Sequence, residues 1–178
     1  MGVTTTTNSA VTYVPIQTTT LNSTQFITFS SIPQTYTDLV TVLQGTNSQA
    51  GVSAVFRLNG DTGSNYSMTY MYGNGTSAGS GRNSNTTYGI IHDFQVGLST
   101  TELFTAVTHF LNYANTTTYK TVISRGNRAG AIVDTGVSLW RGSSGSATQA
   151  ITSITLMSNG GSGFQSGTTA TLYGILAA

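Results

Sequence analysis

Apolar and polar residues alternate with a period of two along most of this chain, and this pattern limits what it can fold into. β-Branched and aromatic residues fill the apolar positions, and no window carries an apolar stripe at helical spacing. An all-β chain is therefore predicted. The expected strands are residues 25–29, 37–44, 52–58, 67–73, 87–96, 102–114, 119–126, 131–141, 151–158 and 169–176. Ten such strands are typical of a two-sheet β-sandwich.

Turn-forming residues separate these strands at regular intervals, which favours a jelly-roll-like sandwich over a helical or α/β fold. Two segments depart from the pattern. Residues 73–85, GNGTSAGSGRNSN, are so rich in Gly and Ser that we expect a mobile loop or one that a partner orders. Residues 1–22 are expected to form an extended N-terminal arm, with a frayed terminus as the alternative, and residues 23–178 the sandwich domain.

Charged residues make up only 6% of the chain, against about 25% in ordinary soluble domains. Hydroxyl and amide groups must therefore keep the surface hydrated. A net charge of +1 leaves no field that would attract nucleic acid or an anionic membrane. No segment is long and apolar enough to span a bilayer, and the N-terminus lacks the pattern of a secretory signal. Cys is absent, which excludes disulfides and thiolate chemistry.

The sequence contains few residues in arrangements that are typical of a catalytic or metal-binding site. The five carboxylates are far apart and belong to no motif, and the two histidines lack a third ligand at a metal-binding spacing. We therefore expect no enzyme, no metal and no cofactor. The strand at 102–114 is apolar on both faces, so it is expected to be central or covered by another subunit, with His109 as a hydrogen-bonded core histidine.

The stretch LNGDTGSNY, residues 58–66, allows two interpretations. Asn59, Asp61 and Asn65 could give oxygen ligands to calcium, but the EF-hand spacing is absent and one carboxylate is little charge for a divalent cation. Asn-Gly at 59–60 favours a tight turn with positive φ, and Asp61 can accept local backbone hydrogen bonds. The turn interpretation is the stronger, and it predicts a reversal between strands 52–58 and 67–73.

Aromatic residues suggest a possible glycan contact. Tyrosines cluster at 66–72, and Trp140 is the only indole in the chain. Sugar recognition uses exposed rings flanked by amide and hydroxyl groups, whereas aromatics that alternate in a strand usually pack in a core or an interface. The candidate contacts with a glycan or another partner are Tyr70, Tyr72, Arg82 and Trp140.

Three segments carry a resemblance to a known group of proteins. They are FITFSSIPQTYTDLVTV (26–42), FRLNGDTGSNYSMTYMYG (56–73) and ITSITLMSNGGSGFQSGTTATLYGIL (151–176). Together they resemble the short β-rich virion structural proteins of tailed bacteriophages, which include capsid decoration (cement) proteins and receptor-binding domains of tail fibres. The resemblance excludes the N-terminal arm and the 73–85 loop. It implies a jelly-roll or related sandwich, a homo-oligomer with a trimer favoured, and no catalysis.

The resemblance leaves two roles open. The favoured expectation is a decoration protein on the capsid exterior, which contacts the major capsid protein, links neighbouring subunits and uses the N-terminal arm as a clamp. The alternative is a receptor-binding module of a tail fibre or spike, which would bind a host-surface glycan. Neither role involves nucleic acid or a membrane.

Overall fold

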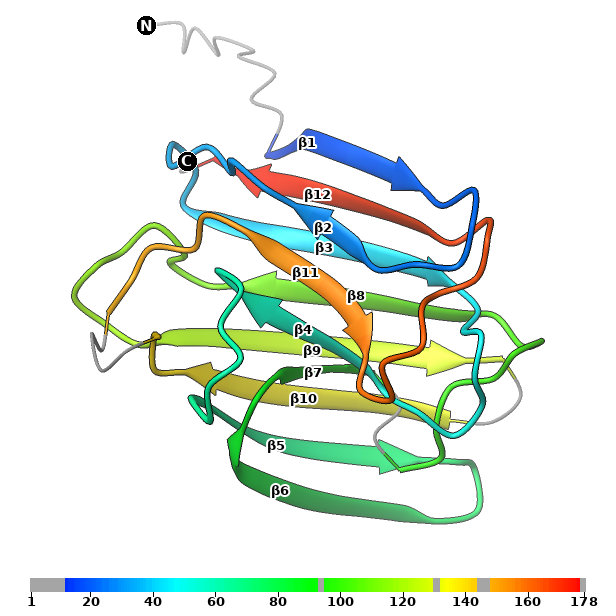
Figure 1. Ribbon diagram of the computed structural model, residues 1–178. Coiled ribbons are helices and arrows are strands. Elements are labelled where there is room, and N and C mark those ends of the chain that lie inside the picture. The colour runs from blue at the N-terminus through cyan, green and yellow to red at the C-terminus, as the bar shows by residue number, and fades with distance from the viewer. Residues whose placement is uncertain (1–11, 93–94, 130–131, 144–147, 177–178) are drawn as a thin grey trace, which may run out of the picture.

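The computed structural model describes residues 12–92, 95–129, 132–143 and 148–176, and in these ranges it contains strands and no helix (Figure 1). The strands are β1 (Tyr13–Thr20), β2 (Ile27–Phe29), β3 (Asp38–Gly45), β4 (Ala54–Leu58), β5 (Tyr66–Gly73), β6 (Ala78–Thr86), β7 (Gly89–His92), β8 (Phe104–Phe110), β9 (Lys120–Arg128), β10 (Ile132–Trp140), β11 (Ile154–Ser158) and β12 (Thr169–Ile175).

Two antiparallel sheets pack against each other in a sandwich-like arrangement. The large sheet has eight strands in the order β1-β12-β3-β8-β9-β10-β5-β6, and the small sheet has four in the order β2-β11-β4-β7. Figure 1 shows the small sheet lying over one face of the large sheet, with β5 and β6 extending past β7. The opposite face of the large sheet is therefore left without a covering layer by the described residues.

The core lies between the sheets, where every second residue of each strand points inward. Phe56 of β4 meets Phe110 of β8 edge-to-face, with ring centroids 5.4 Å apart. Gly89 of β7 makes room for this ring, because a Cβ there would lie 2.1 Å from Phe56 Cζ. A smaller apolar group, Met68, Tyr70 and Ile90, extends the core beneath the β5–β6 hairpin. Burial of both groups supplies the main driving force for folding.

All ten predicted strands are present, which confirms the all-β, two-sheet prediction. The strand predicted at 102–114 is central, because β8 lies between β3 and β9. Two further strands, β1 and β6, lie in segments where no strand was expected. The expected arm, residues 1–22, enters the domain as β1 and pairs with β12 over Tyr13–Thr20. Residues 1–11 lie outside the described residues.

The prediction of a loop at 73–85 is wrong, because most of this segment forms β6. Tyr70 and Tyr72 of β5 face Gly81 and Gly79 of β6 across the strand pair. A Cβ at Gly79 would lie 2.5 Å from the Tyr72 hydroxyl, and one at Gly81 would lie 2.4 Å from that of Tyr70. These glycines are places where aromatic rings pack over the backbone. Only Asn74–Ser77 forms the connecting turn, in which the Asn74 side chain accepts the Ser77 N–H at 2.8 Å.

The 58–66 stretch forms the expected turn, but it does not join two paired strands. Asn59 and Gly60 have φ of 52° and 68°, and the Asp61 N–H donates to the Leu58 carbonyl at 2.9 Å. This is the geometry of a tight Asn-Gly turn. The strands on either side, β4 and β5, belong to different sheets. The predicted reversal is therefore present, and it carries the chain from the small sheet to the large one.

Candidate functional site

The candidate site is the face of the large sheet that points away from the small sheet, called the outer face below. Directly opposed residues of an antiparallel pair point to the same side. One row therefore crosses seven strands of this face, from β6 to β12, through direct cross-strand partners. Its members are Arg82, Thr69, Val137, Ile123, His109, Val40 and Tyr173.

Aliphatic side chains lie exposed on this face, on the half that contains β5, β9 and β10. Met71 is 59% exposed, Val133 60%, Val137 46% and Ile123 40%. Single exposed apolar residues are common, but a contiguous group of them marks an interaction surface in soluble proteins. Their concentration on three neighbouring strands therefore makes this half of the outer face the strongest candidate site.

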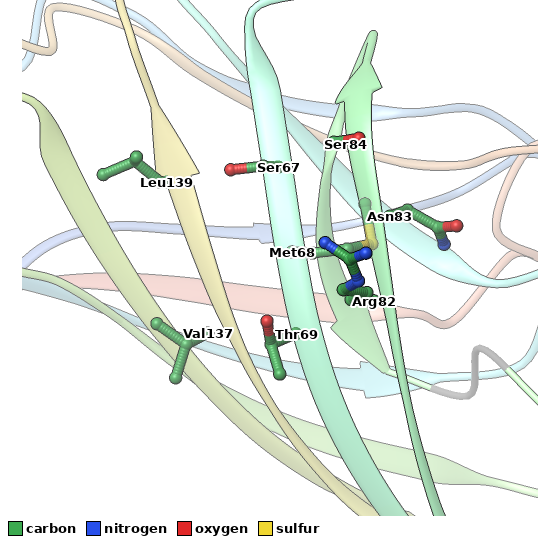
Figure 2. A pocket seen from close by; sticks show the side chains of 8 residues that line it. All are labelled: Ser67, Met68, Thr69, Arg82, Asn83, Ser84, Val137 and Leu139. Carbon is green, nitrogen blue, oxygen red and sulfur yellow. The ribbon is translucent and has the colours of Figure 1, made fainter.

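Shallow hollows follow the same half of the face. One of about 590 Å³ is lined by residues of β5, β6 and β10, among them Thr69, Arg82 and Val137. Figure 2 shows Val137, Thr69 and Arg82 on adjacent strands, with Ser67 and Leu139 beside them. A second of about 600 Å³ lies around Met71 and Val133, and a third of about 380 Å³ around Val107 and Arg125. The surface is an open series of grooves.

Two arginines give the outer face its charge. Among the described residues, the guanidinium groups of Arg82 and Arg125 have neither a hydrogen bond nor a carboxylate partner. The other four cations are engaged with the protein itself: Arg57 with the Thr87 carbonyl, Lys120 with the carbonyls of Asn115 and Thr118, Arg128 with Glu102, and Arg141 with Ser64 and Asn85. The two free guanidinium groups are therefore available to a partner.

His109 also lies on the outer face, half-buried, so the prediction of a core histidine at this position is wrong. The pKa of His109 lies below its ordinary value, first because burial disfavours the charged imidazolium and second because the positive charge of Arg125 is near. The negative charge of Asp38 acts in the opposite direction. The imidazole is therefore neutral at neutral pH. The core histidine of this fold is His92, which the sequence did not single out.

The four residues expected to contact a glycan or partner do not share one surface. Trp140 is buried, 1% exposed, and its indole N–H donates to Asp61. Tyr70 is buried beneath the β5–β6 hairpin, and its hydroxyl accepts a hydrogen bond from Gln95 at 3.0 Å. Tyr72 is half-buried against the same small core. Of the four, Arg82 alone lies on the outer face.

Asp61 explains why the 58–66 stretch contains so many polar side chains. Its carboxylate accepts the Trp140 indole N–H at 2.7 Å, the Gly63 N–H at 2.8 Å, and the Asn65 amide at 3.1 and 3.0 Å on its two oxygens. Asn59 holds the turn against the segment before β11, since its side-chain oxygen accepts hydrogen bonds from the N–H groups of Thr152 and Ser153. The Asp61 and Asn59 oxygens considered as calcium ligands thus accept hydrogen bonds from protein donors, and Asn65 directs its amide nitrogen to Asp61.

The Asp61 network predicts how stability depends on acid. Burial alone would raise the pKa of Asp61, but the hydrogen bonds from Trp140, Asn65 and Gly63 and the charge of Arg57 outweigh it and leave the pKa lowered. The ionised Asp61 carboxylate therefore contributes to the stability of the folded state. This contribution is fully present above the unfolded pKa of about 3.9, and it is lost as the pH falls through the lower pKa of the folded state. Urea unfolding between about pH 6 and pH 2.5 should show that the free energy of unfolding falls more steeply with decreasing pH in the wild type than in Asp61→Asn. Parallel pH curves would contradict the network.

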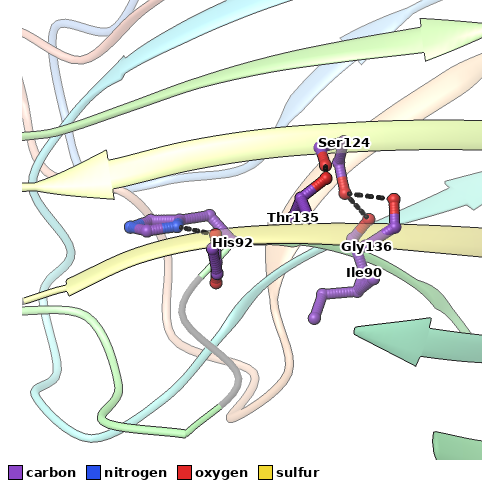
Figure 3. Close-up of polar contacts among 6 residues, drawn as sticks. Ile90, His92, Ser124, Thr135 and Gly136 are labelled. Carbon is purple, nitrogen blue, oxygen red and sulfur yellow. Dashed lines mark hydrogen bonds and ion pairs between the residues drawn. The ribbon is translucent and has the colours of Figure 1, made fainter. Parts of the chain in front are cut away.

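A buried hydrogen bond joins the small sheet to the large one. The His92 Nδ1 atom lies 2.6 Å from the Asp134 Oδ1 atom, and the imidazole stacks on Phe104 with ring centroids 5.9 Å apart. Figure 3 shows His92 and, in a separate group of contacts, Ser124 with Ile90 and Gly136. The Ser124 hydroxyl donates to the Ile90 carbonyl at 3.1 Å and approaches the Gly136 carbonyl at 3.4 Å, so it is not aligned with His92 as a nucleophile would be. The cluster connects the two layers.

Within the ranges that the structure describes, no three His, Asp or Glu side chains are grouped as they would be to hold a metal ion. The described carboxylates other than Asp61 are also engaged: Asp38 with the Asn112 N–H, Glu102 with Arg128, and Asp134 with His92. In the same ranges no helix is long and apolar enough to cross a membrane. Asp93 lies outside the described residues.

Comparison with protein-family models, curated proteins and solved structures found no match to this chain. The function must therefore be argued from the geometry of the chain itself.

The outer face was not predicted as a site from the sequence, although the alternating apolar residues that form it are visible there. Val133, Thr135 and Val137 alternate with inward residues along β10, and each exposed position of this strand could also have been read as a core position. Only the position of the small sheet decides which face is buried.

Proposed function

We propose that this chain is a bacteriophage virion structural protein, a capsid decoration (cement) protein that binds the outside of the shell and links neighbouring capsid subunits. The observation that carries the proposal is the uncovered, largely aliphatic half of the outer face, with its two free arginines. The sequence resemblance to phage virion proteins supports the class. The low charge of the chain fits a protein whose function is packing against another surface.

The size of the outer face suits such a role. Eight strands about 4.8 Å apart and about seven residues long at roughly 3.3 Å per residue give a face of about 34 by 23 Å. This area is close to the roughly 800 Å² that each partner contributes to a standard specific interface. The whole outer face, which includes the exposed aliphatic half, therefore has the size of one side of a standard specific interface.

We also propose that the sandwich is jelly-roll-like, and the strand order supports this. In the large sheet β1, β12, β3 and β8 are neighbours, and the small sheet has the order β2-β11-β4-β7. This nesting of first strands with last strands is the arrangement that two Greek keys produce in a jelly roll. In this description β9, β10, β5 and β6 are additional strands that widen one sheet, and they form the half of the outer face with the exposed aliphatic residues.

Self-association is part of the proposal, with three copies as the expected number. A second apolar group supports it at the end of the β1–β12 pair, where Tyr13 is 48% and Leu176 42% exposed. Tyr13 packs edge-to-face on Tyr173 there, with centroids 6.2 Å apart. This corner is separate from the exposed half of the outer face. One copy can therefore contact another copy through the corner and the shell through the outer face at the same time. Light scattering of the purified chain would measure the copy number.

The alternative function is a glycan-binding module of a tail fibre or spike. The groove beside Arg82 favours it, because Ser67, Thr69, Asn83 and Ser84 line it with hydroxyl and amide groups. Aromatic stacking, the other common element of sugar recognition, is not offered by Trp140 or Tyr70, which are both buried. The decoration role therefore has the better support.

Binding to empty shells tests the proposal. Shells assembled from the major capsid protein of the phage that encodes this chain should bind the purified chain saturably, with many copies per shell, and should then resist heat-induced opening better. Attachment at a few positions per virion, or binding to immobilised host glycans with no binding to shells, would instead indicate the receptor-binding role. A matched measurement with bovine serum albumin in place of the chain controls for non-specific adsorption.

A further inference from the structure

We propose that the outer face docks on an acidic, partly apolar protein surface, with Arg82 and Arg125 as its charged contacts and the neighbouring aliphatic strip as its apolar part. The aliphatic strip comprises Val137, Ile123, Met71 and Val133. The inference rests on the proposed function for the source of the partner, the capsid shell. It adds the site on this chain and the charge of the surface that the site recognises.

The register of the sheet places Val137 and Met71 between the two arginines, while Ile123 neighbours Arg125 on β9 and Val133 lies one row further along β10. Arg82 of β6 is the partner of Thr69, which is followed across the sheet by Val137 and Ile123. Arg125 lies two residues along β9 from Ile123, on the same face. The two Cα atoms are therefore about 14 Å apart across the strands and about 7 Å apart along them. A partner that satisfies both charges must also cover Val137 and Met71, the part of the aliphatic strip that lies between them.

Charge argues against a second copy of this chain as the occupant. The described part of the outer face carries Arg82 and Arg125 but only one carboxylate, Asp38, which already accepts the Asn112 N–H. Two copies packed face to face would thus each present net positive charge to the other, and opposed like charges disfavour an interface. A surface with acidic groups removes this penalty and gives both guanidinium groups partners.

The composition of the face argues for protein over nucleic acid or glycan. Interfaces between proteins are depleted of charge at their centre, but Arg and Met are enriched in them, and the strip matches this description. A nucleic-acid site needs several basic groups that follow a phosphate backbone, and this face has two. A glycan has little apolar surface to cover Val133 and Met71, which are about 60% exposed.

A pair of double variants tests the charge component. Arg82→Ala/Arg125→Ala and Thr62→Glu/Thr116→Glu change the net charge by the same amount, but Thr62 and Thr116 are exposed residues in loops away from the outer face. The wild type should bind the capsid shells more weakly as salt rises. The arginine double variant should bind roughly tenfold more weakly at low salt, the loss expected for two exposed ion pairs, whereas the threonine double variant should bind like the wild type. Thermal unfolding of each variant controls for the fold.

Chemical protection tests the position of the interface. Because the chain contains no Cys, a single introduced cysteine can be labelled selectively. Val137→Cys lies in the strip, and Val96→Cys lies in the loop after β7; the native side chains are 46% and 48% exposed. Shell binding should protect position 137 from maleimide and leave position 96 reactive.

The outcomes separate the two proposals. Saturable shell binding with equal affinity in both double variants, or with position 137 still reactive, overturns this inference and leaves the decoration role standing. No binding of the wild type to shells overturns both. Protection of position 137 by self-association of the free chain, without shells, would assign the face to a second copy and also overturn the inference.

Discussion

Replacing Asp61 with alanine is expected to lower the free energy of unfolding by about 3–5 kcal/mol, because a buried, fully bonded carboxylate would be lost. The Trp140 indole N–H, the Gly63 N–H and the Asn65 amide all donate to this carboxylate. After the substitution the buried indole would have no acceptor. Urea denaturation monitored by the fluorescence of Trp140, the chain's only tryptophan, measures both the stability and the environment of the ring.

Neighbouring substitutions control this experiment. Thr62→Ala changes an exposed residue of the same loop and should alter stability by less than about 0.5 kcal/mol. In a double-mutant cycle, Trp140→Phe removes the donor, so Asp61→Ala should cost clearly less in that background than in the wild type. Additive losses would mean that the hydrogen bond between Asp61 and Trp140 contributes nothing to stability.

Replacing His92 with alanine is expected to cost about 3 kcal/mol, the second large effect in this fold. The substitution removes a fully buried imidazole that packs on Phe104 and contacts Asp134 at 2.6 Å. It leaves a cavity between the sheets and removes the side-chain hydrogen bond to Asp134. Chemical denaturation with an unchanged m-value would show that the loss is one of stability rather than of cooperativity.

The second histidine provides the matched control. His109 lies half-buried on the outer face, and no hydrogen bond of its side chain is present among the described residues. His109→Ala should therefore cost less than about 1 kcal/mol. Equal losses at positions 92 and 109 would contradict the assignment of His92 as the histidine that joins the layers.

Much of the secondary structure could be predicted from the sequence, because strands that pack on one side carry a period-two pattern. The segment 37–44 and β3 (Asp38–Gly45) differ by one residue at each end. The prediction failed at β6, where glycine and serine indicated a loop. Its glycines lie opposite Tyr70 and Tyr72, and a residue's partner across a sheet is not visible in its own local sequence.

The candidate site was less predictable than the fold. Arg82 was selected from the sequence and lies on the outer face, but Trp140 was selected for the rarity of its ring and proves to be buried against Asp61. An aromatic residue in an alternating strand is equally consistent with either face. Arg125 was not selected, because its charge becomes notable only once the other cations are seen to be engaged within the protein.

Local residue chemistry and composition were enough to predict the all-β class, most strand positions, the Asn-Gly turn and the low charge. Tertiary structure alone decided which face of each strand is buried, since the small sheet covers one side of the large sheet and leaves the other exposed. That choice buried Trp140, set His92 against Asp134, and placed Arg82 and Arg125 on the same open surface. Period-two patterns specify that a strand has two faces, and the packing of the second sheet specifies which of them a partner can reach.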